Sequence, residues 1–309
     1  MLYAGSVLDR RRFLSLAAAS AFAQTPPQRV IDTHIHLFDP TRPLGVPWPP
    51  KDNTALYKPA LPARYRALTS GLNIVGAIEV ECSPWLEDNQ WVLDVAARDN
   101  AGGKIIVGTV GNLDLGDAAF PKQIERFHRN TLFRGIRFGN LWGRNLGDEV
   151  RKPAFIDGLK LLADADLVLD TANPDAALMR AARAVTDGVP NLRVVIDHLP
   201  QMDPATARAD LRELAARPQV FVKVSQVLRR VDGRVPLDLA FYRDRIDEVF
   251  TLFGEDRVLY GSDWPNSDNW AGYADVFGLV RDYFAQKTAG VRDKYFYGNS
   301  QRVYKWNPR

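Results

Sequence analysis

Two histidines that are two residues apart, His34 and His36, follow an apolar stretch that begins at Val30. The stretch Val30-Ile31-Asp32-Thr33-His34-Ile35-His36 is rich in β-branched residues and predicts a short buried strand. Because side chains alternate between the two sides of a strand, both imidazoles project from the same side. Such a pair can bind a metal ion or a substrate oxygen, or it can simply be hydrogen-bonded in a turn.

Other residues with useful chemistry stand at the ends of later apolar stretches. A third histidine, His198, ends the stretch Val194-Val195-Ile196-Asp197-His198, and it can be either a site residue or a satisfied core histidine. The fourth and last histidine, His128, lies in a helix-like segment beside Arg126 and Arg129, which indicates a solvated side chain. Three charged residues also follow apolar stretches: Glu81, Arg137 and Asp263.

The elements that carry these residues alternate between strand-like and helix-like. Eight short apolar strands are predicted, at residues 30–36, 73–81, 104–110, 133–138, 167–170, 192–197, 220–224 and 257–261. Helix-like segments separate them; one is expected to begin at Asn173-Pro174-Asp175, with Asn173 as N-cap. This alternation predicts parallel βαβ units and, at this length, one α/β domain folded as a (β/α)8 TIM barrel over residues 24–309.

An open doubly wound sheet is the alternative fold. It would need a glycine-rich phosphate-binding turn after the first strand, where this chain has Asp39-Pro40 and a loop rich in proline and tryptophan. The barrel is therefore favoured. Active sites of such barrels lie at the carboxyl ends of the strands, so one rim is expected to gather the polar residues His34, His36, Glu81, Arg137, His198 and Asp263.

Composition excludes several classes of function. The 309 residues carry a net charge of only +3, and basic and acidic residues are interspersed without a basic block, which argues against nucleic acid as a partner. Cys82 is the one cysteine, so an intrachain disulfide and a cysteine-rich metal site are excluded. We interpret Cys82 as a small buried apolar residue. The oligomeric state does not follow from the sequence.

The first residues have the features of an export signal. Asp9-Arg10-Arg11-Arg12-Phe13-Leu14-Ser15 resembles the bacterial twin-arginine signal, an apolar run extends to Phe22, and Ala21-Phe22-Ala23 is a small-x-small cleavage site. Residues 1–23 are therefore expected to be an export signal read by the twin-arginine machinery, which places the mature protein in the periplasm or outside the cell. The apolar run is too short to span a bilayer, and no stable membrane span is expected after the signal is removed.

Three ordered motifs resemble those of a known superfamily. Asp32-Thr33-His34-Ile35-His36, Ile196-Asp197-His198-Leu199 and Tyr260-Gly261-Ser262-Asp263-Trp264-Pro265 are similar to the markers of the amidohydrolase superfamily. More narrowly, they resemble its amidohydrolase-related branch, which includes pyrone-dicarboxylate lactonases and fuconate-type sugar-acid lactonases. The resemblance covers essentially the whole chain after the export signal, and it implies a TIM-barrel hydrolase.

The chain also departs from the two-metal members of that superfamily. Those members place a lysine or glutamate after the fourth strand and a histidine after the fifth, where this chain has Arg137 and Asp170. The resemblance therefore implies at most one divalent ion, with zinc the best match to nitrogen and oxygen ligands. A site without metal remains open. The ligands implied are His34, His36, His198 and Asp263.

These residues suggest the hydrolysis of a lactone or related ester of a small carboxylate or sugar-acid substrate. Asp263 is the expected general base, and the histidines, His198 among them, would polarise the carbonyl with or without one metal ion. Arg137 would fork onto a substrate carboxylate or carbonyl. Glu81, Lys223 and Trp264 are the other expected substrate contacts, although Glu81 and Lys223 could instead be counter-charges inside the barrel and Trp264 ordinary packing.

Two other functions remain open at this stage. One is metal-dependent decarboxylation, which related barrels perform, usually with a histidine after the fifth strand that is absent here. The other is an exported protein that binds a small molecule without reacting with it. Binding alone has no need for a carboxylate beside three histidines, so hydrolysis is favoured.

Overall fold

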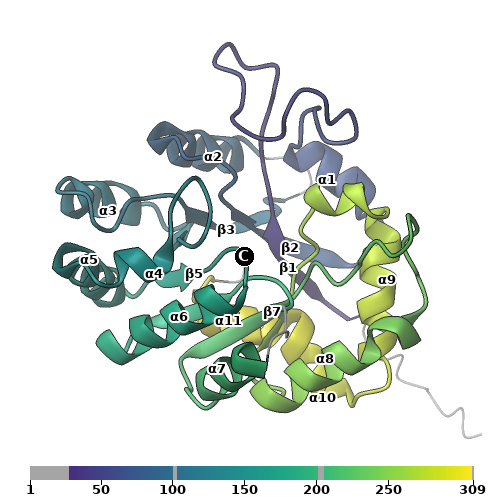
Figure 1. Cartoon of the computed structure of the whole chain (residues 1–309). Helices are drawn as coiled ribbons and strands as arrows, with labels where there is room; N and C mark the ends of the chain where they lie inside the picture. Colours follow the sequence, from purple (N-terminus) through teal and green to yellow (C-terminus); the bar gives the residue numbers. More distant parts are fainter. Residues whose placement is uncertain (1–27, 100–102, 201–204, 308–309) are drawn as a thin grey trace, which may run out of the picture.

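The computed structural model describes residues 28–99, 103–200 and 205–307. Eight parallel strands form one sheet in the order β1 to β8, and helices surround the strands (Figure 1). The predicted single-domain (β/α)8 barrel is therefore confirmed. The predicted export signal, residues 1–23, lies outside the described residues.

The strands match the predicted apolar stretches and differ from them only at their ends. They contribute buried aliphatic side chains to the barrel interior and to the layer beneath the helices. Their bounds are β1 (Val30–Ile35), β2 (Ile74–Val80), β3 (Ile106–Gly111), β4 (Phe133–Arg137), β5 (Val168–Asp170), β6 (Arg193–Ile196), β7 (Val220–Val224) and β8 (Val258–Tyr260).

The long helices were also predicted from the sequence, whereas the short elements α4, α10, η1 and η2 were not. Among the described residues, no helix is long and apolar enough to cross a bilayer. The helices are α1 (Pro62–Leu68), α2 (Leu86–Arg98), α3 (Phe120–His128), α4 (Leu146–Glu149), α5 (Pro153–Asp164), α6 (Ala176–Gly188), α7 (Ala205–Ala215), α8 (Leu239–Phe253), η1 (Asn266–Asn269), α9 (Tyr273–Phe284), α10 (Ala289–Asp293), η2 (Lys294–Gly298) and α11 (Asn299–Tyr304).

The barrel closes where the end of β1 meets the segment after β8. The amide of Asp263 donates to the carbonyl of His34 at 2.8 Å, and the amide of His36 donates to the carbonyl of Trp264 at 2.7 Å. Gly261 allows this approach, because a Cβ at that position would lie 2.8 Å from the Cβ of His34. This junction brings the first and last strands of the barrel together and sets Asp263 beside the histidines of β1.

Asp32 anchors the same junction from below. Its carboxylate accepts hydrogen bonds from the amide of Ser262 at 2.8 Å and from the hydroxyls of Tyr65 and Tyr273, both at 2.9 Å. The side chain is fully buried, and burial raises the pKa of Asp32 although these donors oppose that effect. Asp32 therefore has a structural part in the Asp-Thr-His-Ile-His motif, because it fixes the loop that carries Asp263.

Candidate active site

A pocket of about 610 Å³ opens at the carboxyl ends of the strands, the expected rim of the barrel. Its size is within the usual range for a site that binds a small molecule. Four of the predicted site residues line it, together with uncharged polar and aromatic side chains. The lining residues are His36, Trp48, Cys82, Arg137, Leu141, Trp142, Ala172, Asn173, His198, Gln226, Asp263 and Asn266.

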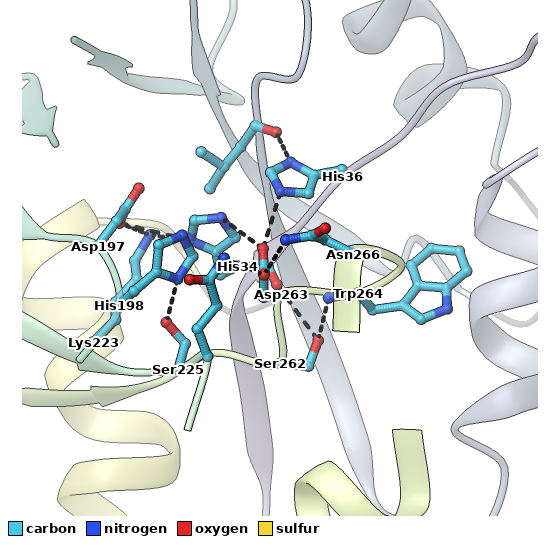
Figure 2. A network of polar contacts seen from close by, with 12 residues as sticks. His34, His36, Asp197, His198, Lys223, Ser225, Ser262, Asp263, Trp264 and Asn266 are labelled. Atoms are coloured by element: carbon cyan, nitrogen blue, oxygen red, sulfur yellow. Dashed lines mark hydrogen bonds and ion pairs between the residues drawn. The ribbon is translucent and has the colours of Figure 1, made fainter. Parts of the chain in front are cut away.

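Three buried side chains converge beneath the pocket. His34, His198 and Asp263 each offer a ligand atom within 4.8 Å of the others. His34 Nε2 lies 3.5 Å from Asp263 Oδ1, and the ring centres of His34 and His198 are 4.6 Å apart. Figure 2 shows the rings of His34 and His198 on one side of Asp263, with the indole of Trp264 on the other. The sequence prediction that residues from strands one, six and eight meet is confirmed.

His36 also lies against Asp263, and its other ring nitrogen contacts a backbone carbonyl. Its Nδ1 lies 2.7 Å from the carbonyl oxygen of Val80, which only accepts, so Nδ1 carries a proton and donates it. In neutral His36 the Nε2 lone pair would then face Asp263 Oδ1, only 3.1 Å away. Two acceptors at that distance need a proton or a metal ion between or beside them. His36 therefore marks a place where positive charge is required.

Asp263 has one oxygen held by amides and one turned to the histidines. Oδ2 accepts hydrogen bonds from Gln226 Nε2 and Asn266 Nδ2, both at 2.8 Å, whereas Oδ1 faces His36 and His34. Burial alone would raise the pKa of Asp263, but His198, His36 and the Gln226 amide bring it below the usual value. Asp263 is therefore an ionised carboxylate at neutral pH, with a single oxygen directed at the reaction centre.

The imidazoles of His34 and His198 are neutral at neutral pH. Burial, and then the positive charges of Lys223 and Arg137 among the neighbouring groups, hold the pKa of His34 well below its usual value; burial does the same for His198. His198 Nδ1 lies 2.9 Å from the hydroxyl of Ser225, which can either donate or accept. His198 can thus present Nε2 to the pocket as a hydrogen-bond donor or as a metal ligand.

Arg137 lies at the pocket, but its fork is already occupied. Its Nε donates to Glu81 Oε1 at 2.9 Å and its Nη2 donates to the Glu81 carbonyl oxygen at 2.6 Å. Glu81 Oε2 accepts from the amide of Ser83 and from the indole of Trp142, both at 3.0 Å. The predicted substrate contact of Glu81 is therefore corrected: Glu81 is the partner of Arg137. The edge of the guanidinium formed by Nε and Nη2 is therefore already paired with Glu81 and is not free to bind a substrate carboxylate.

Lys223 and Trp264 do not reach the pocket, and their predicted substrate contacts are wrong. Lys223 is 0% exposed, and its ammonium pairs with Asp170 at 2.7 Å and Asp197 at 2.8 Å. The ring of Trp264 is also fully buried and packs against Tyr65, with 5.3 Å between ring centres. The structure bears out the counter-charge and packing interpretations for these two residues.

The backbone around the pocket is unusual. Five lining residues other than glycine have positive φ angles, a region that side chains with a Cβ seldom adopt. Three of them, His198, Gln226 and Asp263, follow β6, β7 and β8 and aim their side chains inward. Strain of this kind often gathers at functional sites. The five angles are 59° for Trp142, 55° for Asn173, 71° for His198, 47° for Gln226 and 62° for Asp263.

Asn173 is one of the corrections to the sequence prediction. Helix α6 begins after Asp175, whose carboxylate accepts from the amide of Leu178 at 2.8 Å and is the actual N-cap. Asn173 instead lines the pocket, and its amide donates to the carbonyl of Asn140 at 2.7 Å. Gln226 and Asn266 were not predicted either. The only signals for them in the sequence are that Gln226 stands two residues after the seventh strand and that Asn266 stands three residues after Asp263.

The residues present fit a divalent metal ion. The Nε2 atom of His34 is buried and has no hydrogen-bond partner among the described residues, although it points toward Asp263. A buried nitrogen without a partner costs free energy, and a cation bound there would remove that cost. Two neutral imidazoles and a carboxylate also form a donor set typical of zinc and similar ions. The cluster of His34, His198 and Asp263 could therefore bind one metal ion.

Comparisons with known proteins extend over nearly the whole chain. A family model described as Amidohydrolase matches residues 31–306. A curated L-fucono-1,5-lactonase from Burkholderia ambifaria is 30% identical over 258 residues, which cover 80% of this chain and 84% of that protein.

Solved structures show the same fold. A crystal structure of an amidohydrolase from Burkholderia multivorans with bound zinc has a TM-score of 0.80 and 24% identity, and the match covers 90% of this chain and all of that one. A protein from Pseudomonas putida, assigned as a 2-pyrone-4,6-dicarboxylic acid hydrolase, has a TM-score of 0.72 and 20% identity, with 91% and 99% covered.

Proposed function

This chain belongs to the amidohydrolase family, and from that premise we propose that it hydrolyses the ester bond of an uncharged sugar-acid lactone. The observation that carries the proposal is the setting of Asp263. One of its oxygens is fixed by two amides, and the other faces His34 and His36 at the base of an open pocket. The family match and the similarity to L-fucono-1,5-lactonases support lactones as the substrate class.

The charges of the pocket favour a neutral substrate. Arg137 is the one cationic residue among the described lining residues, and Glu81 already neutralises it. The other polar groups of the lining, such as Trp142, Asn173 and Gln226, can form hydrogen bonds with hydroxyl groups. A substrate with two carboxylates would lose its hydration here and gain no free cation in return. A polyhydroxylated lactone fits these side chains better.

The reaction needs one water molecule and one proton acceptor. Water lies between Asp263 Oδ1 and the lactone carbonyl, and it attacks the carbonyl carbon as its proton passes to Oδ1. The developing oxyanion faces His198, whose Nε2 can donate to it when no ion is bound there. When the ring C–O bond breaks, protonated Asp263 returns the proton to the leaving ring oxygen. The product is the open-chain hydroxy acid, and Asp263 is regenerated.

The proposal includes one divalent ion, with zinc the first candidate, held by His34, His198 and Asp263. The bound zinc in the Burkholderia multivorans structure is the reason to test zinc first. When bound, such an ion polarises a carbonyl and lowers the pKa of a water molecule. His36 and the amides of Gln226 and Asn266 orient Asp263 in either case.

A lactone panel tests this function. Purified protein is assayed by proton release with L-fucono-1,5-lactone and with 2-pyrone-4,6-dicarboxylate, each with and without added zinc. We expect kcat/KM for the neutral lactone to exceed that for the dicarboxylate by about a hundredfold or more, because a buried charge without a partner is costly. A preference for the dicarboxylate would contradict the proposal. Binding of lactones without turnover would instead support a binding protein.

Decarboxylation is the weaker alternative. Asp170 is the last residue of β5, and its carboxylate is held by the ammonium of Lys223 at 2.7 Å and the hydroxyl of Tyr304 at 2.7 Å. It therefore turns away from the pocket and supplies no ligand there. Release of carbon dioxide from hydroxybenzoates, at a rate that matches or exceeds lactone hydrolysis, would favour this function.

We also propose that the chain is exported by the twin-arginine route and cut after Ala23. The support is the pattern of Arg10, Arg11 and Arg12 followed by Phe13-Leu14 and by Ala21-Phe22-Ala23. The intact mass of the exported protein measures the new amino terminus, and replacement of the three arginines by lysine is the control that should block export. A mature chain that still begins at Met1 would contradict the proposal.

A further inference from the structure

The histidines around Asp263 differ in the polar group that lies behind the ring, at Nδ1. Behind His36 is the carbonyl oxygen of Val80, 2.7 Å from Nδ1. Behind His198 is the hydroxyl of Ser225, 2.9 Å from Nδ1 (Figure 2). A carbonyl oxygen only accepts a hydrogen bond, whereas a hydroxyl group can donate or accept one. The proton of neutral His36 is therefore fixed on Nδ1, but that of neutral His198 is not.

The barrel holds Ser225 firmly in this place. Ser225 directly follows β7 and is buried, and its carbonyl oxygen accepts a hydrogen bond from the amide of Leu199 at 3.0 Å. This bond ties it to the segment that carries His198. Among the described residues, no other side chain competes for the hydroxyl, so its hydrogen can turn toward the ring or away from it.

The pocket side of His198 determines which of the two states is favourable. Its ligand atom lies within 4.8 Å of that of Asp263, which is an ionised carboxylate. Without an ion, an N–H group directed at this carboxylate is more favourable than a lone pair, so Nε2 carries the proton and Ser225 donates to Nδ1. A bound ion requires the lone pair of Nε2, so the proton then lies on Nδ1 and is donated to Ser225. The ring carries one proton in both states, because solvent takes the proton from Nε2 and returns one to Nδ1.

His34 has a similar freedom, but two side chains provide it. The ammonium of Lys223, a donor, lies 3.4 Å from His34 Nδ1, and Asp197 Oδ1, an acceptor, lies 3.6 Å from it. A group of suitable polarity is therefore close to Nδ1 in either tautomer. His34 and His198 are also the two histidines of the cluster that could bind an ion, and His36, with its fixed proton, is not part of that cluster.

We propose that Ser225 is a positioning residue that lets His198 exchange its tautomer. The ring then serves as a ligand when an ion is bound and as a hydrogen-bond donor to the oxyanion when none is bound. This inference deepens the proposed hydrolase, on which it rests, because it explains how His198 can serve both states without leaving its buried Nδ1 unpaired. Ser225 acts only through His198 and contacts neither the substrate nor the ion.

The position of the ring proton tests this role without any assay of activity. The wild-type protein is labelled with 15N in its histidine side chains, and NMR spectra are recorded with and without zinc, because protonated and unprotonated ring nitrogens differ widely in 15N shift. The chain has only four histidines, and the signals of His198 are those that His198→Gln lacks. We expect the His198 proton on Nε2 without zinc and on Nδ1 with zinc. The His36 proton should stay on Nδ1 in both spectra.

Zinc affinity provides the second readout. Ser225→Ala removes the acceptor of the Nδ1 proton, so the Kd for zinc, measured by competition with a chelator, should rise by about tenfold or more, which is usual when a metal-bound histidine loses its partner. Ser267→Ala is the matched control and should leave the Kd unchanged, because it removes a buried hydroxyl that has no hydrogen-bond partner among the described residues.

Three results would each overturn the proposal: a His198 proton that stays on the same nitrogen when zinc is added, a wild-type protein that does not bind zinc, or equal zinc affinity in Ser225→Ala and Ser267→Ala. Because these results concern the ring proton and the ion alone, they remain distinct from a failure to hydrolyse lactones.

Discussion

His34 separates two polar regions that both contain buried carboxylates and differ in their source of positive charge. Its Nε2 side faces the pocket, where His198 and Asp263 converge and no fixed cation is in contact among the described residues. Its Nδ1 side faces the interior, where Lys223 lies between Asp170 and Asp197. We call these the rim cluster (His34, His36, His198, Asp263) and the interior cluster (Lys223, Asp170, Asp197).

The difference shows how one barrel can separate reactivity from structure. In the interior cluster the cation is part of the chain, so both carboxylates always have a positive charge beside them, and solvent is excluded. In the rim cluster a buried nitrogen lacks a partner, and a carboxylate oxygen faces an open pocket. Such incompletely paired groups cost stability, but they can bind water, substrate or an ion. The following changes test this contrast, beginning with the largest expected effect.

Asp263→Asn removes the proton acceptor of the rim cluster and keeps its shape. We expect kcat on the lactone to fall by about a hundred- to ten-thousandfold, since that is the usual cost of losing a positioned base. The midpoint of urea unfolding should change little. Metal content must be measured in parallel, because Asp263 is also a candidate ligand. A variant that keeps its metal state and wild-type turnover would refute the role of Asp263.

Arg137→Met tests whether the arginine at the pocket is mainly a partner of Glu81. Its loss leaves a buried carboxylate without its cation, which is expected to destabilise the protein by about 3–5 kcal/mol. The matched double variant Arg137→Met/Glu81→Gln removes both charges and should recover most of that stability. Urea unfolding of the three proteins measures both quantities. If Arg137→Met raised KM and left stability unchanged, a direct grip on substrate would be the better account.

Gln226→Ala tests the amides that fix Asp263. It removes one of two donors to Oδ2, a bond to a charged group, so kcat should fall by about ten- to a hundredfold with little change in KM. Gln90→Ala is the matched control, because it removes an amide-to-carboxylate bond to Asp94 on the outer surface of α2. Equal kinetics for the two variants would show that Gln226 does not position the base.

Asp170→Asn tests the interior cluster through pH. The pKa of Asp170 in the folded protein is about 7, above the value of an unfolded chain, so the folded state binds this proton more tightly. Its contribution to stability is therefore present at low pH and is lost as pH rises through 7. Between pH 5 and pH 8 the free energy of unfolding of the wild type should fall relative to that of Asp170→Asn, by about 2–3 kcal/mol. If the difference in unfolding free energy between the wild type and Asp170→Asn were the same at both pH values, Asp170 would keep the same charge between them.

Much of the fold follows from local patterns in the sequence. Alternating apolar and helical stretches identify the eight strands, and the barrel geometry then places His34, His198 and Asp263 on one rim. The prediction succeeded for these residues because strand ends are visible as breaks in apolar runs. The side-chain period of a strand also correctly places both His34 and His36 near Asp263.

The division between the two clusters does not follow from such patterns. Lys223, Glu81 and Trp264 also stand near the carboxyl ends of strands, and only the packed structure shows that their partners are Asp197, Arg137 and Tyr65. Gln226 and Asn266 were missed for a related reason. An amide becomes a positioning group only when left-handed turns and a 3-10 segment direct it at Asp263, and these depend on contacts between distant strands.

The position of a bound ion tests the contrast between the two clusters most directly. Crystals of the wild-type protein are soaked in zinc, and the anomalous signal is measured at the zinc absorption edge. We expect one peak, among His34 Nε2, His198 and Asp263, with the Lys223 ammonium still between Asp170 and Asp197. A peak between Asp170 and Asp197 with Lys223 displaced, or the absence of any peak at the rim cluster, would contradict this account.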